Sequence, residues 1–301
     1  MTQTKIAYKT NLGLCCQGDI DEILKSKAFA KYKKKLNLIF TSPPFPLNRK
    51  KKYGNLNGKE YLNWLSGLAL NFRDFLTEDG SIVIELGNAW EANGPIMSTL
   101  PLKALLEFQE KGNYFLCQHF IWFNTARLPS PVQWVNVERV RVKDAFTHIW
   151  WLSKTPNPKA NNRNVLEDYS ESMKKLLKKK KYNSGQRPSE HLIGAKSFLK
   201  DNNGAIPSNV LIGANTISTS KYIEYCKKNN IELHPARMPE FIPDFFIKYL
   251  TDPGDLVFDP FGGSNTTGWV AEKLKRKWIS VEIKESYIKG SKGRFNIKTK
   301  S

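Results

Sequence analysis

FDPFGGSNTTG, residues 258 to 268, completes a short apolar run that begins at Leu256, and it predicts a strand that ends in a glycine-rich turn. Glycine lets the backbone approach a ligand closely, and the helix expected after the turn begins with N–H groups that lack helical partners. Open α/β sheets bind their ligands here, beyond the carboxyl ends of the strands. The segment therefore indicates a parallel sheet with a ligand site at its edge, with a purely structural turn as the alternative.

The chemistry around this turn favours a nucleoside-type ligand without phosphates. The lysine of a P-loop is absent, and so is the G-x-G-x-x-G spacing of dinucleotide-binding folds. Asp259 ends its strand and Glu282 ends the next one, and an acidic residue at such a position suits ribose hydroxyls. S-adenosylmethionine fits this combination, so we expect it as the cofactor.

A second motif, Thr41-Ser42-Pro43-Pro44-Phe45, follows the apolar run Leu36 to Phe40. The two prolines end a strand, because they remove backbone donors and fix φ. They direct the Ser42 hydroxyl and the Pro43 carbonyl at one small donor, while Phe45 offers a face for a planar ring. An exocyclic amino group fits, since hydrogen bonds from its N–H groups turn its lone pair toward a methyl group. The alternative is an ordinary proline turn capped by serine.

Strands and helices are predicted to alternate along most of the chain, which argues for an α/β fold with a doubly wound, mostly parallel sheet. Apolar runs predict the strands, and apolar residues at helical spacing predict the helices. The expected strands are 12–16, 36–40, 81–85 (after a turn at 79–80), 115–123, 145–152, 256–258 and 278–282. The expected helices are 20–31, 60–76, 100–111, 243–250 and 266–274, with a last one from residue 284.

A long stretch after Ser153 interrupts this alternation. It is rich in Asn, Lys, Gly and Ser, shows little periodicity before Ile231, and is too long for a structureless loop in a compact domain. We therefore predict three regions: a first α/β part in 1–154 that contains the proline motif, an inserted, basic module in 155–230, and a second α/β part in 231–301 that contains the glycine turn.

The charge balance predicts a polyanionic partner. Lys and Arg number 47 against 28 acidic residues, a formal net charge of +19. Nucleic acid is the simplest such partner, with a membrane surface or a generically basic protein as alternatives. No apolar run approaches the ~20 residues of a membrane-spanning helix, and the N-terminus lacks the apolar core of a secretory signal, so we expect a cytoplasmic protein without a membrane partner.

The four cysteines argue against two kinds of site. Cys15, Cys16, Cys117 and Cys226 form no C-x-x-C pair and have no histidine at metal spacing, so neither a disulfide framework nor a bound metal is expected. None of them follows a proline, so catalysis by the thiolate of a Pro-Cys pair is not expected either.

At these motifs the chain resembles the amino-group DNA methyltransferases in their beta arrangement, in which the catalytic motif precedes the target-recognition region and the cofactor motif comes last. In that family serine at the first position of the catalytic motif marks N4-cytosine enzymes, whereas Asp or Asn usually marks N6-adenine enzymes. Ser42 therefore implies cytosine N4, on a Rossmann-like fold with a circularly permuted motif order. Further blocks extend the resemblance over nearly the whole chain: 49–51, 53–56, 128–131, 141–145, 234–237 and 262–268.

The resemblance also implies which residues hold the cofactor. Asp19 is expected near its adenine and Glu282 near its ribose. The glycine turn is expected along the methionine side, and the segment from His234 leads into a helix that closes the same pocket. The complete set is Asp19, His234, Pro235, Ala236, Asp259, Phe261, Gly262, Gly263, Ser264, Thr266, Thr267 and Glu282.

The expected catalytic residues are Ser42, Pro43, Pro44, Phe45 and Glu85. The strand that contains Ile84 is expected to bring Glu85 beside Ser42, at a position where a close relative has the shorter aspartate. A proton relay and a purely structural carboxylate are both open for this residue. Because an amino group inside duplex DNA is out of reach, the target base must leave the helix, at a cost of a few kcal/mol.

Candidate DNA contacts fall into two segments. Arg49, Lys50 and Lys51 form a basic stretch that we interpret as a mobile lid over the extruded nucleotide, with a solvated loop as the alternative. The inserted region supplies candidates for phosphate contact and for base reading, which are Arg163, Lys174, Lys175, Arg187, Ser189, His191 and Lys196.

The sequence is thus interpreted as a cytosine-N4 DNA methyltransferase of a type II restriction-modification system. Its expected partners are double-stranded DNA and a cognate restriction endonuclease, and we expect a monomer that acts on bacterial DNA. The resemblance through Val165 to Asn209 implies a CAGCTG-like site. The alternatives are N6-adenine methylation, a non-catalytic DNA-binding protein on the same fold, and RNA as the substrate.

Overall fold

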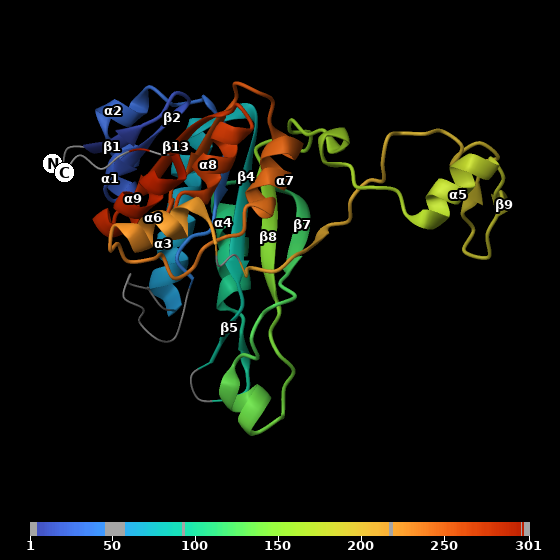
Figure 1. The fold of residues 1–301 in the computed structure, drawn as a ribbon, viewed down its shortest axis with the longest axis horizontal. Coiled ribbons are helices and arrows are strands. Elements are labelled where there is room, and N and C mark those ends of the chain that lie inside the picture. The colour runs from blue at the N-terminus through green and yellow to red at the C-terminus, as the bar shows by residue number, and fades with distance from the viewer. Residues whose placement is uncertain (1–4, 46–57, 92–93, 217–218, 296, 298–301) are drawn as a thin grey trace. The chain divides into compact units, whose positions relative to one another are not determined.

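A nine-stranded sheet is the centre of the fold (Figure 1). The computed structural model describes residues 5–45, 58–91, 94–216, 219–295 and 297. Five neighbouring strands are parallel, in the order β2 (Gly13–Gln17), β13 (Lys277–Glu282), β12 (Leu256–Asp259), β3 (Leu36–Thr41) and β4 (Leu76–Gly87). The mostly parallel sheet predicted from the sequence is confirmed.

Strands outside the parallel core extend the sheet on both sides. β1 (Lys5–Lys9) pairs antiparallel with β2. On the other side, β8 (Phe146–Ser153) runs antiparallel to β4 and to β7 (Phe115–Phe123), and β11 (Val210–Ile212) is parallel to β7. A separate short pair, β5 (Ala89–Trp90) and β6 (Met97–Ser98), follows β4.

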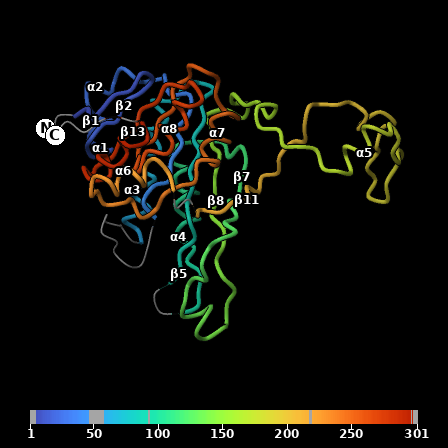
Figure 2. The backbone as a smooth tube through the Cα atoms, viewed as in Figure 1, coloured from blue at the N-terminus to red at the C-terminus, as the bar shows by residue number. Residues whose placement is uncertain are grey.

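Segments from the two ends of the chain lie side by side in the sheet. Figure 2 shows the blue backbone of β2 next to the red backbone of β13. The pairing is parallel from Gly13 opposite Trp278 to Gln17 opposite Glu282. Segments near the two ends of the sequence therefore supply neighbouring strands of one sheet.

Helices cover both faces of the sheet, because alternate residues of each buried strand point to opposite sides. In β3, Ile39 packs against one helical layer, and Leu38 and Phe40 pack against the other. All three side chains are fully buried, and burial of such side chains contributes ~1.5–3 kcal/mol each. The first layer contains α1 (Ile20–Lys25), α2 (Lys27–Ala30), α3 (Gly58–Phe75) and α4 (Leu100–Lys111). The second contains α7 (Phe241–Leu250), α8 (Thr266–Lys273) and α9 (Glu285–Ser291), followed by a 3₁₀ turn at Lys292–Phe295.

The single helix predicted over 20–31 is wrong, since α1 and α2 are separate. Ser26 has an extended backbone between them, with φ −72° and ψ 143°. Its hydroxyl accepts a hydrogen bond from the Phe29 N–H at 3.2 Å and so caps the second helix. A serine that bonds nearby backbone competes with helix continuation, which explains the break.

The turn predicted at Asp79 and Gly80 lies inside a strand. β3 pairs Leu36 with Leu76 but Leu38 with Ser81, so residues 77–80 form an irregularity within β4. The preceding helix α3 therefore ends at Phe75, and β4 begins at the next residue, Leu76.

A helix that periodicity did not predict, α6 (Lys221–Lys228), precedes residue 231. The Ser220 hydroxyl caps it by accepting from the Ile223 N–H, and Tyr222, Ile223 and Cys226 are its buried face. The serine cap and the apolar spacing were readable in the sequence, but lysines dominate the segment and conceal the pattern.

The chain divides into two compact units, which we call the core unit (Met1–Ala160 with Asn209–Ser301) and the inserted unit (Asn161–Ser208). The inserted unit contains a 3₁₀ turn at Asn162–Val165, helix α5 (Glu171–Lys179) and the hairpin of β9 (Gly185–Gln186) with β10 (Leu192–Ile193). An antiparallel bridge between Glu167 and Ala205 joins its two ends. The region predicted for target recognition, 155–230, is longer than this unit, and its functional bounds stay a prediction.

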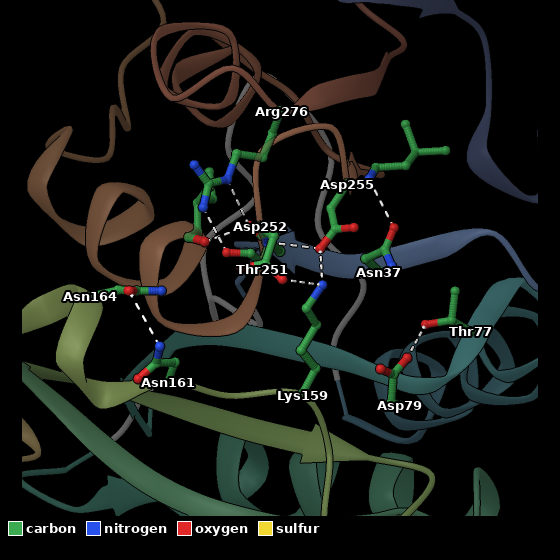
Figure 3. A network of polar contacts seen from close by, with 12 residues as sticks. Asn37, Thr77, Asp79, Lys159, Asn161, Asn164, Thr251, Asp252, Asp255 and Arg276 are labelled. Carbon is green, nitrogen blue, oxygen red and sulfur yellow. Dashed lines mark hydrogen bonds and ion pairs between the residues drawn. The ribbon is translucent and has the colours of Figure 1, made fainter.

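A network of polar contacts stabilises the sheet edge opposite the carboxyl ends of the parallel strands (Figure 3). Lys159, which follows β8, contacts the carboxylates of Asp252 and Asp255 at 2.7 Å each. Arg276 donates to the Thr251 hydroxyl at 3.0 Å and to the Thr251 carbonyl at 2.6 Å. These contacts connect the exit of β8 to the chain that enters β12.

Candidate active site

Five residues predicted from the sequence lie at one edge of the sheet, each at or just after the end of a parallel strand. Because the strands are neighbours, their carboxyl ends follow one another ~4.8 Å apart. In sheet order, the residues are Asp19 after β2, Glu282 on β13, Asp259 on β12, Ser42 after β3 and Glu85 on β4.

A hydrogen bond joins the two motifs that are far apart in the sequence. The Thr41 hydroxyl donates to Asp259 Oδ1 at 3.0 Å, across 218 residues of chain. Asp259 also accepts from the Thr267 hydroxyl at 2.6 Å and from the Phe261 N–H at 3.0 Å. Burial outweighs these three donors and raises the pKa of Asp259 to about 6. The catalytic motif and the glycine turn therefore share one buried carboxyl group.

Ser42, the residue after Thr41, forms a close pair with Glu85. The Ser42 hydroxyl donates to Glu85 Oε2 at 2.6 Å, the length of a strong hydrogen bond to a carboxylate. Glu85 is 3% exposed, and burial raises the pKa of its carboxyl group above the usual value. The Ser42 hydroxyl and the positive charge of Arg127 act in the opposite direction. The longer side chain of glutamate thus reaches Ser42 directly.

Phe45 follows the two prolines and lies against β4. A Cβ atom added to Gly87 would come within 2.5 Å of the Phe45 ring, so only glycine fits beneath the ring. Pro43 and Pro44 carry no backbone N–H group, so at these two positions the backbone offers only carbonyl acceptors. The structure therefore brings Ser42 and Phe45 to the end of β4, beside Glu85.

The glycine turn is fixed by the next strand. Gly263 has φ +51°, and its N–H donates to Glu282 Oε2 at 2.8 Å. The other oxygen of Glu282 accepts from the Lys284 N–H at 2.8 Å. Burial raises the pKa of Glu282, while these backbone donors lower it. At the rim, Asp19 is exposed and caps α1 by accepting from the Asp21 N–H at 2.9 Å.

Arg294, which the sequence interpretation did not include, holds the glycine turn from behind. Its guanidinium donates to the Ser264 carbonyl at 2.7 Å, to the Ser264 hydroxyl at 3.2 Å and to the Thr266 hydroxyl at 3.0 Å. Arg294 is 6% exposed and has Glu240 at 3.5 Å. The side chains of Ser264 and Thr266 therefore face a buried arginine, which supports the turn.

His234 packs on the other side of the turn. Its Nε2 atom lies 3.1 Å from the place where a Cβ of Gly263 would be, and its ring contacts Tyr287 edge-on at 4.4 Å. Burial lowers the pKa of His234 to about 4, so the imidazole is neutral at pH 7. Its Nδ1 atom accepts from the Ala236 N–H at 3.3 Å, while Pro235 and Ala236 themselves are exposed.

Two aromatic side chains of α3 complete the edge, although the sequence marked them only as core positions. Trp64 lies between Tyr61 and Phe261, with ring centroids 5.7 and 5.4 Å apart. The Tyr61 hydroxyl is buried and has no hydrogen-bond partner among the described residues. Burial raises the pKa of the Tyr61 hydroxyl, and the negative charge of Glu85 raises it further. The Tyr61 hydroxyl is therefore close enough to Glu85 to interact with its charge.

Comparison with known proteins agrees with this geometry. A family model described as DNA methylase matches residues 36–293. The type II methyltransferase M.PvuII of Proteus hauseri is 46% identical over 293 residues, which cover 97% of this chain and 86% of that protein. The chain belongs to this N6/N4 DNA methylase family.

Solved structures of DNA methylases share the fold. The structure named PvuII DNA methyltransferase (cytosine-N4-specific) matches with a TM-score of 0.78 and 38% identity, covering 99% of this chain and 92% of that one. The M1.HpyAVI–SAM complex matches with a TM-score of 0.56 over 95% of this chain and 100% of that one. Its identity is 19%, so this second likeness concerns the fold alone.

In this DNA methylase, the residues predicted to contact DNA lie in two places. Arg49, Lys50 and Lys51 lie outside the described residues. The other seven all belong to the inserted unit, and all are exposed: Arg163, Lys174, Lys175, Arg187, Ser189, His191 and Lys196.

Within the inserted unit, three of these residues come together on the loop between β9 and β10. The Arg187 N–H donates to the His191 carbonyl at 2.9 Å, and Ser189 lies between them. Lys174 and Lys175 lie on α5, where Lys174 pairs with Glu171 at 2.8 Å. The unit thus presents one hairpin loop and one lysine-rich helix.

No group of three His, Cys, Asp or Glu side chains in the described part of the chain is arranged to hold a metal ion. Among the same residues, no helix has the length and apolar character needed to cross a membrane.

Proposed function

We propose that this DNA methylase transfers a methyl group from S-adenosylmethionine to N4 of cytosine in duplex DNA, as part of a type II restriction-modification system. The observation that carries the proposal is the Ser42–Glu85 pair, joined through Thr41 and Asp259 to the glycine turn. Serine at the head of the motif and the likeness to a cytosine-N4-specific relative favour cytosine over adenine.

The residues at the glycine turn fit S-adenosylmethionine. Each oxygen of Glu282 accepts one backbone N–H, which leaves acceptor capacity for two ribose hydroxyls. Trp64 and Phe261 supply an apolar wall, and Asp19 lies at the exposed rim for the adenine. Arg294 donates to the backbone and hydroxyl groups of the turn, so its guanidinium is engaged there and is not available to a phosphate. When bound, S-adenosylmethionine supplies an electrophilic methyl group on its sulfur.

Ser42 and Glu85 then prepare the target nitrogen. The Ser42 hydroxyl donates to Glu85, so its oxygen lone pairs are oriented to accept an N–H from the cytosine amino group. The Pro43 carbonyl accepts the second N–H, and the nitrogen lone pair turns toward the methyl group. As the N–C bond forms and the C–S bond breaks, the amino proton passes to Ser42 and the Ser42 proton passes to Glu85.

Phe45 and the basic segments hold the DNA around this reaction. The Phe45 ring, held at the end of β4, stacks on the extruded cytosine. We propose Arg49, Lys50 and Lys51 as a clamp on the backbone beside that nucleotide. Lys174 and Lys175 on α5 contact phosphates, while the loop from Arg187 to His191, with Arg163 and Lys196, reads base edges.

The biological setting follows from the same proposal. The chain protects host DNA in the bacterial cytoplasm from a cognate restriction endonuclease, and it acts as a monomer on a CAGCTG-like site. Plasmid DNA recovered from cells that express the chain is expected to resist an endonuclease that cuts CAGCTG. Complete cutting of that plasmid would refute the proposed recognition sequence but not the proposed methylation reaction.

The reaction is tested with labelled S-adenosylmethionine and duplex DNA, followed by nucleoside analysis. We expect N4-methylcytosine, with a loss of at least ~100-fold in the Ser42→Ala variant because a hydrogen-bonded positioning group is removed. Cofactor binding, measured by calorimetry, is expected to stay unchanged in that variant. Ser66→Ala is the matched control, because among the described residues this serine of α3 donates to the Asn63 carbonyl.

Each other outcome of this assay has a defined meaning. Detection of N6-methyladenine instead of N4-methylcytosine would refute the proposed product and show that the chain methylates adenine. Absence of label on DNA together with normal DNA binding would indicate a non-catalytic DNA-binding protein. Label on RNA but not on DNA would change the substrate. A fully active Ser42→Ala variant would refute the role assigned to this serine.

A further inference from the structure

The loop between β7 and β8, residues 124–145, extends from the sheet edge that carries the candidate active site. β8 begins where β4 ends, because Thr147 pairs with Gly87. Asn88 fixes the base of the loop by donating to Asp144 Oδ1 at 2.9 Å and to the Phe146 carbonyl at 3.3 Å. Figure 1 shows this loop in green, continuing beyond the end of β4 and beside β5.

The two arms of the β7–β8 loop lie against each other near its base. The Asp144 N–H donates to the Ser130 carbonyl at 3.0 Å. The Lys143 ammonium group lies 3.5 Å from the Arg127 carbonyl oxygen. These contacts place the arm with Leu128 beside the arm with Val142.

Leu128 and Val142 are unusually exposed for aliphatic side chains. Their exposed fractions are 81% and 87%, although the core unit has two large clusters in which such side chains are buried. Basic residues stand next to them, with Arg127 before Leu128 and Lys143 after Val142. An exposed apolar pair with basic neighbours is typical of a surface that meets a partner.

Charge identifies this partner as DNA rather than a second copy of the chain. The loop carries four basic residues, which are Arg127, Arg139, Arg141 and Lys143. None of the four forms an ion pair with a carboxylate in the described residues. The two acidic residues of the loop are already bonded, Glu138 by Gln133 and Asp144 by Asn88. The loop therefore presents unpaired positive charge, which repels a like-charged copy and attracts phosphates.

The position of the loop fits a contact close to the target base. Val142 is two residues from Asp144, which is bonded to Asn88, and Asn88 is three residues from Glu85. Such chain segments span at most ~7 and ~11 Å, so the apolar pair lies within reach of a duplex whose target base is extruded to the Ser42–Glu85 pair. The charge of Arg127 also acts on Glu85, since it lowers the pKa of that carboxyl group.

We propose that Leu128 and Val142 form a wedge that enters the duplex and fills the space left by the extruded cytosine, while Arg127 and Lys143 contact the flanking phosphates. Apolar side chains inserted between base steps unstack them and stabilise the deformed duplex. The wedge deepens the proposed function, because it rests on extrusion of the target base.

The test compares wild type with the double variant Leu128→Ala/Val142→Ala on duplexes that carry the methylated site, which is mapped beforehand by protection of plasmid DNA from restriction digestion. Extrusion is followed by the fluorescence of 2-aminopurine placed at the target position, and methylation is followed by kcat and KM. We expect the fluorescence increase to fall several-fold and kcat/KM to fall about 10–100-fold on the matched duplex. On a duplex with a mismatch at the target pair, where extrusion costs less, the two proteins are expected to differ by at most about 2-fold.

Two further variants separate the wedge from general effects. Leu70→Ala, a half-exposed leucine on α3, is expected to behave as wild type. Val142→Leu in the Leu128→Ala background restores apolar bulk and is expected to recover most of the fluorescence. Wild-type fluorescence and kcat in the double variant would overturn the wedge, and so would a defect that persists on the mismatched duplex. No methylation of any duplex by wild type would instead refute the proposed function itself.

Discussion

At the scale of single residues, the chemistry depends on a buried carboxyl group that is in contact with a hydroxyl. Water cannot solvate Glu85, so its carboxylate holds a proton more readily than a surface carboxylate does. Its contact with Ser42 provides a short path for that proton. A raised pKa therefore suits Glu85 to accept the proton that the amino group loses.

Glu85→Gln is expected to lower kcat by ~100-fold or more, because the amide accepts no proton. In wild type, kcat is expected to fall as the pH decreases through the raised pKa of Glu85, since the protonated carboxyl cannot act as a base. The variant lacks this acid limb, and a pH profile of kcat measures the difference. Glu78→Gln on the same strand changes an exposed carboxylate paired with Lys154 and is expected to leave the profile unchanged.

The stability of the Glu85→Gln variant distinguishes a chemical role from a structural one. A raised folded-state pKa means that ionised Glu85 opposes folding at pH 7, so the amide is expected to maintain or raise the melting temperature. A marked decrease in melting temperature would show that the carboxylate mainly holds the fold. The open choice between relay and structural carboxylate is decided by this pair of measurements.

At the scale of elements, the lysine-rich helix α5 is a small surface of positive charge. Its apolar residues Met173, Leu176 and Leu177 are only half buried, and its lysines are exposed. Packing of these side chains within the inserted unit therefore stabilises α5 only weakly. The proposed phosphate contact by the lysines would account for this amphipathic helix.

Lys174→Gln/Lys175→Gln is expected to weaken DNA binding at low salt and to reduce the slope of log K against log salt by ~1 for each lost phosphate contact. The loss applies equally to cognate and unrelated duplexes, since phosphates carry no base identity. Fluorescence anisotropy over a salt series measures both effects. Lys103→Gln/Lys111→Gln on α4 is the control with the same charge change, and an identical slope change there would assign the effect to net charge alone.

At the scale of the whole molecule, a side-chain hydrogen bond between Thr41 and Asp259 connects the two motifs of the proposed chemistry. Thr41 precedes Ser42, the proposed catalytic serine, and Asp259 begins the glycine turn. The two strands are neighbours only because the sheet places β3 beside β12, across most of the chain. Folding of the sheet is therefore the event that assembles the site.

Thr41→Val is expected to reduce the free energy of unfolding by ~1–3 kcal/mol, because buried Asp259 loses one of its three donors. The effect is expected to be largest above pH 6, where Asp259 is ionised, and to shrink as the pH falls below its pKa of about 6. Urea unfolding at pH 7.5 and pH 5 measures both. Thr77→Val removes an equivalent bond to exposed Asp79, and an equal loss in that control would contradict the argument from burial.

The sequence by itself indicated seven of the nine strands of the large sheet but not β1 or β11, because apolar runs, prolines and glycines act within a few neighbouring residues. It thereby predicted the sheet, and it predicted that four residues lie at the carboxyl ends of its strands: Ser42, Glu85, Asp259 and Glu282. Only the tertiary structure decided how these ends meet: the Thr41–Asp259 bond, the support of the turn by Arg294, the buried hydroxyl of Tyr61 and the position of the β7–β8 loop. The physical reason is that these contacts join residues distant in sequence, and strand order, not local pattern, brings them within hydrogen-bond distance.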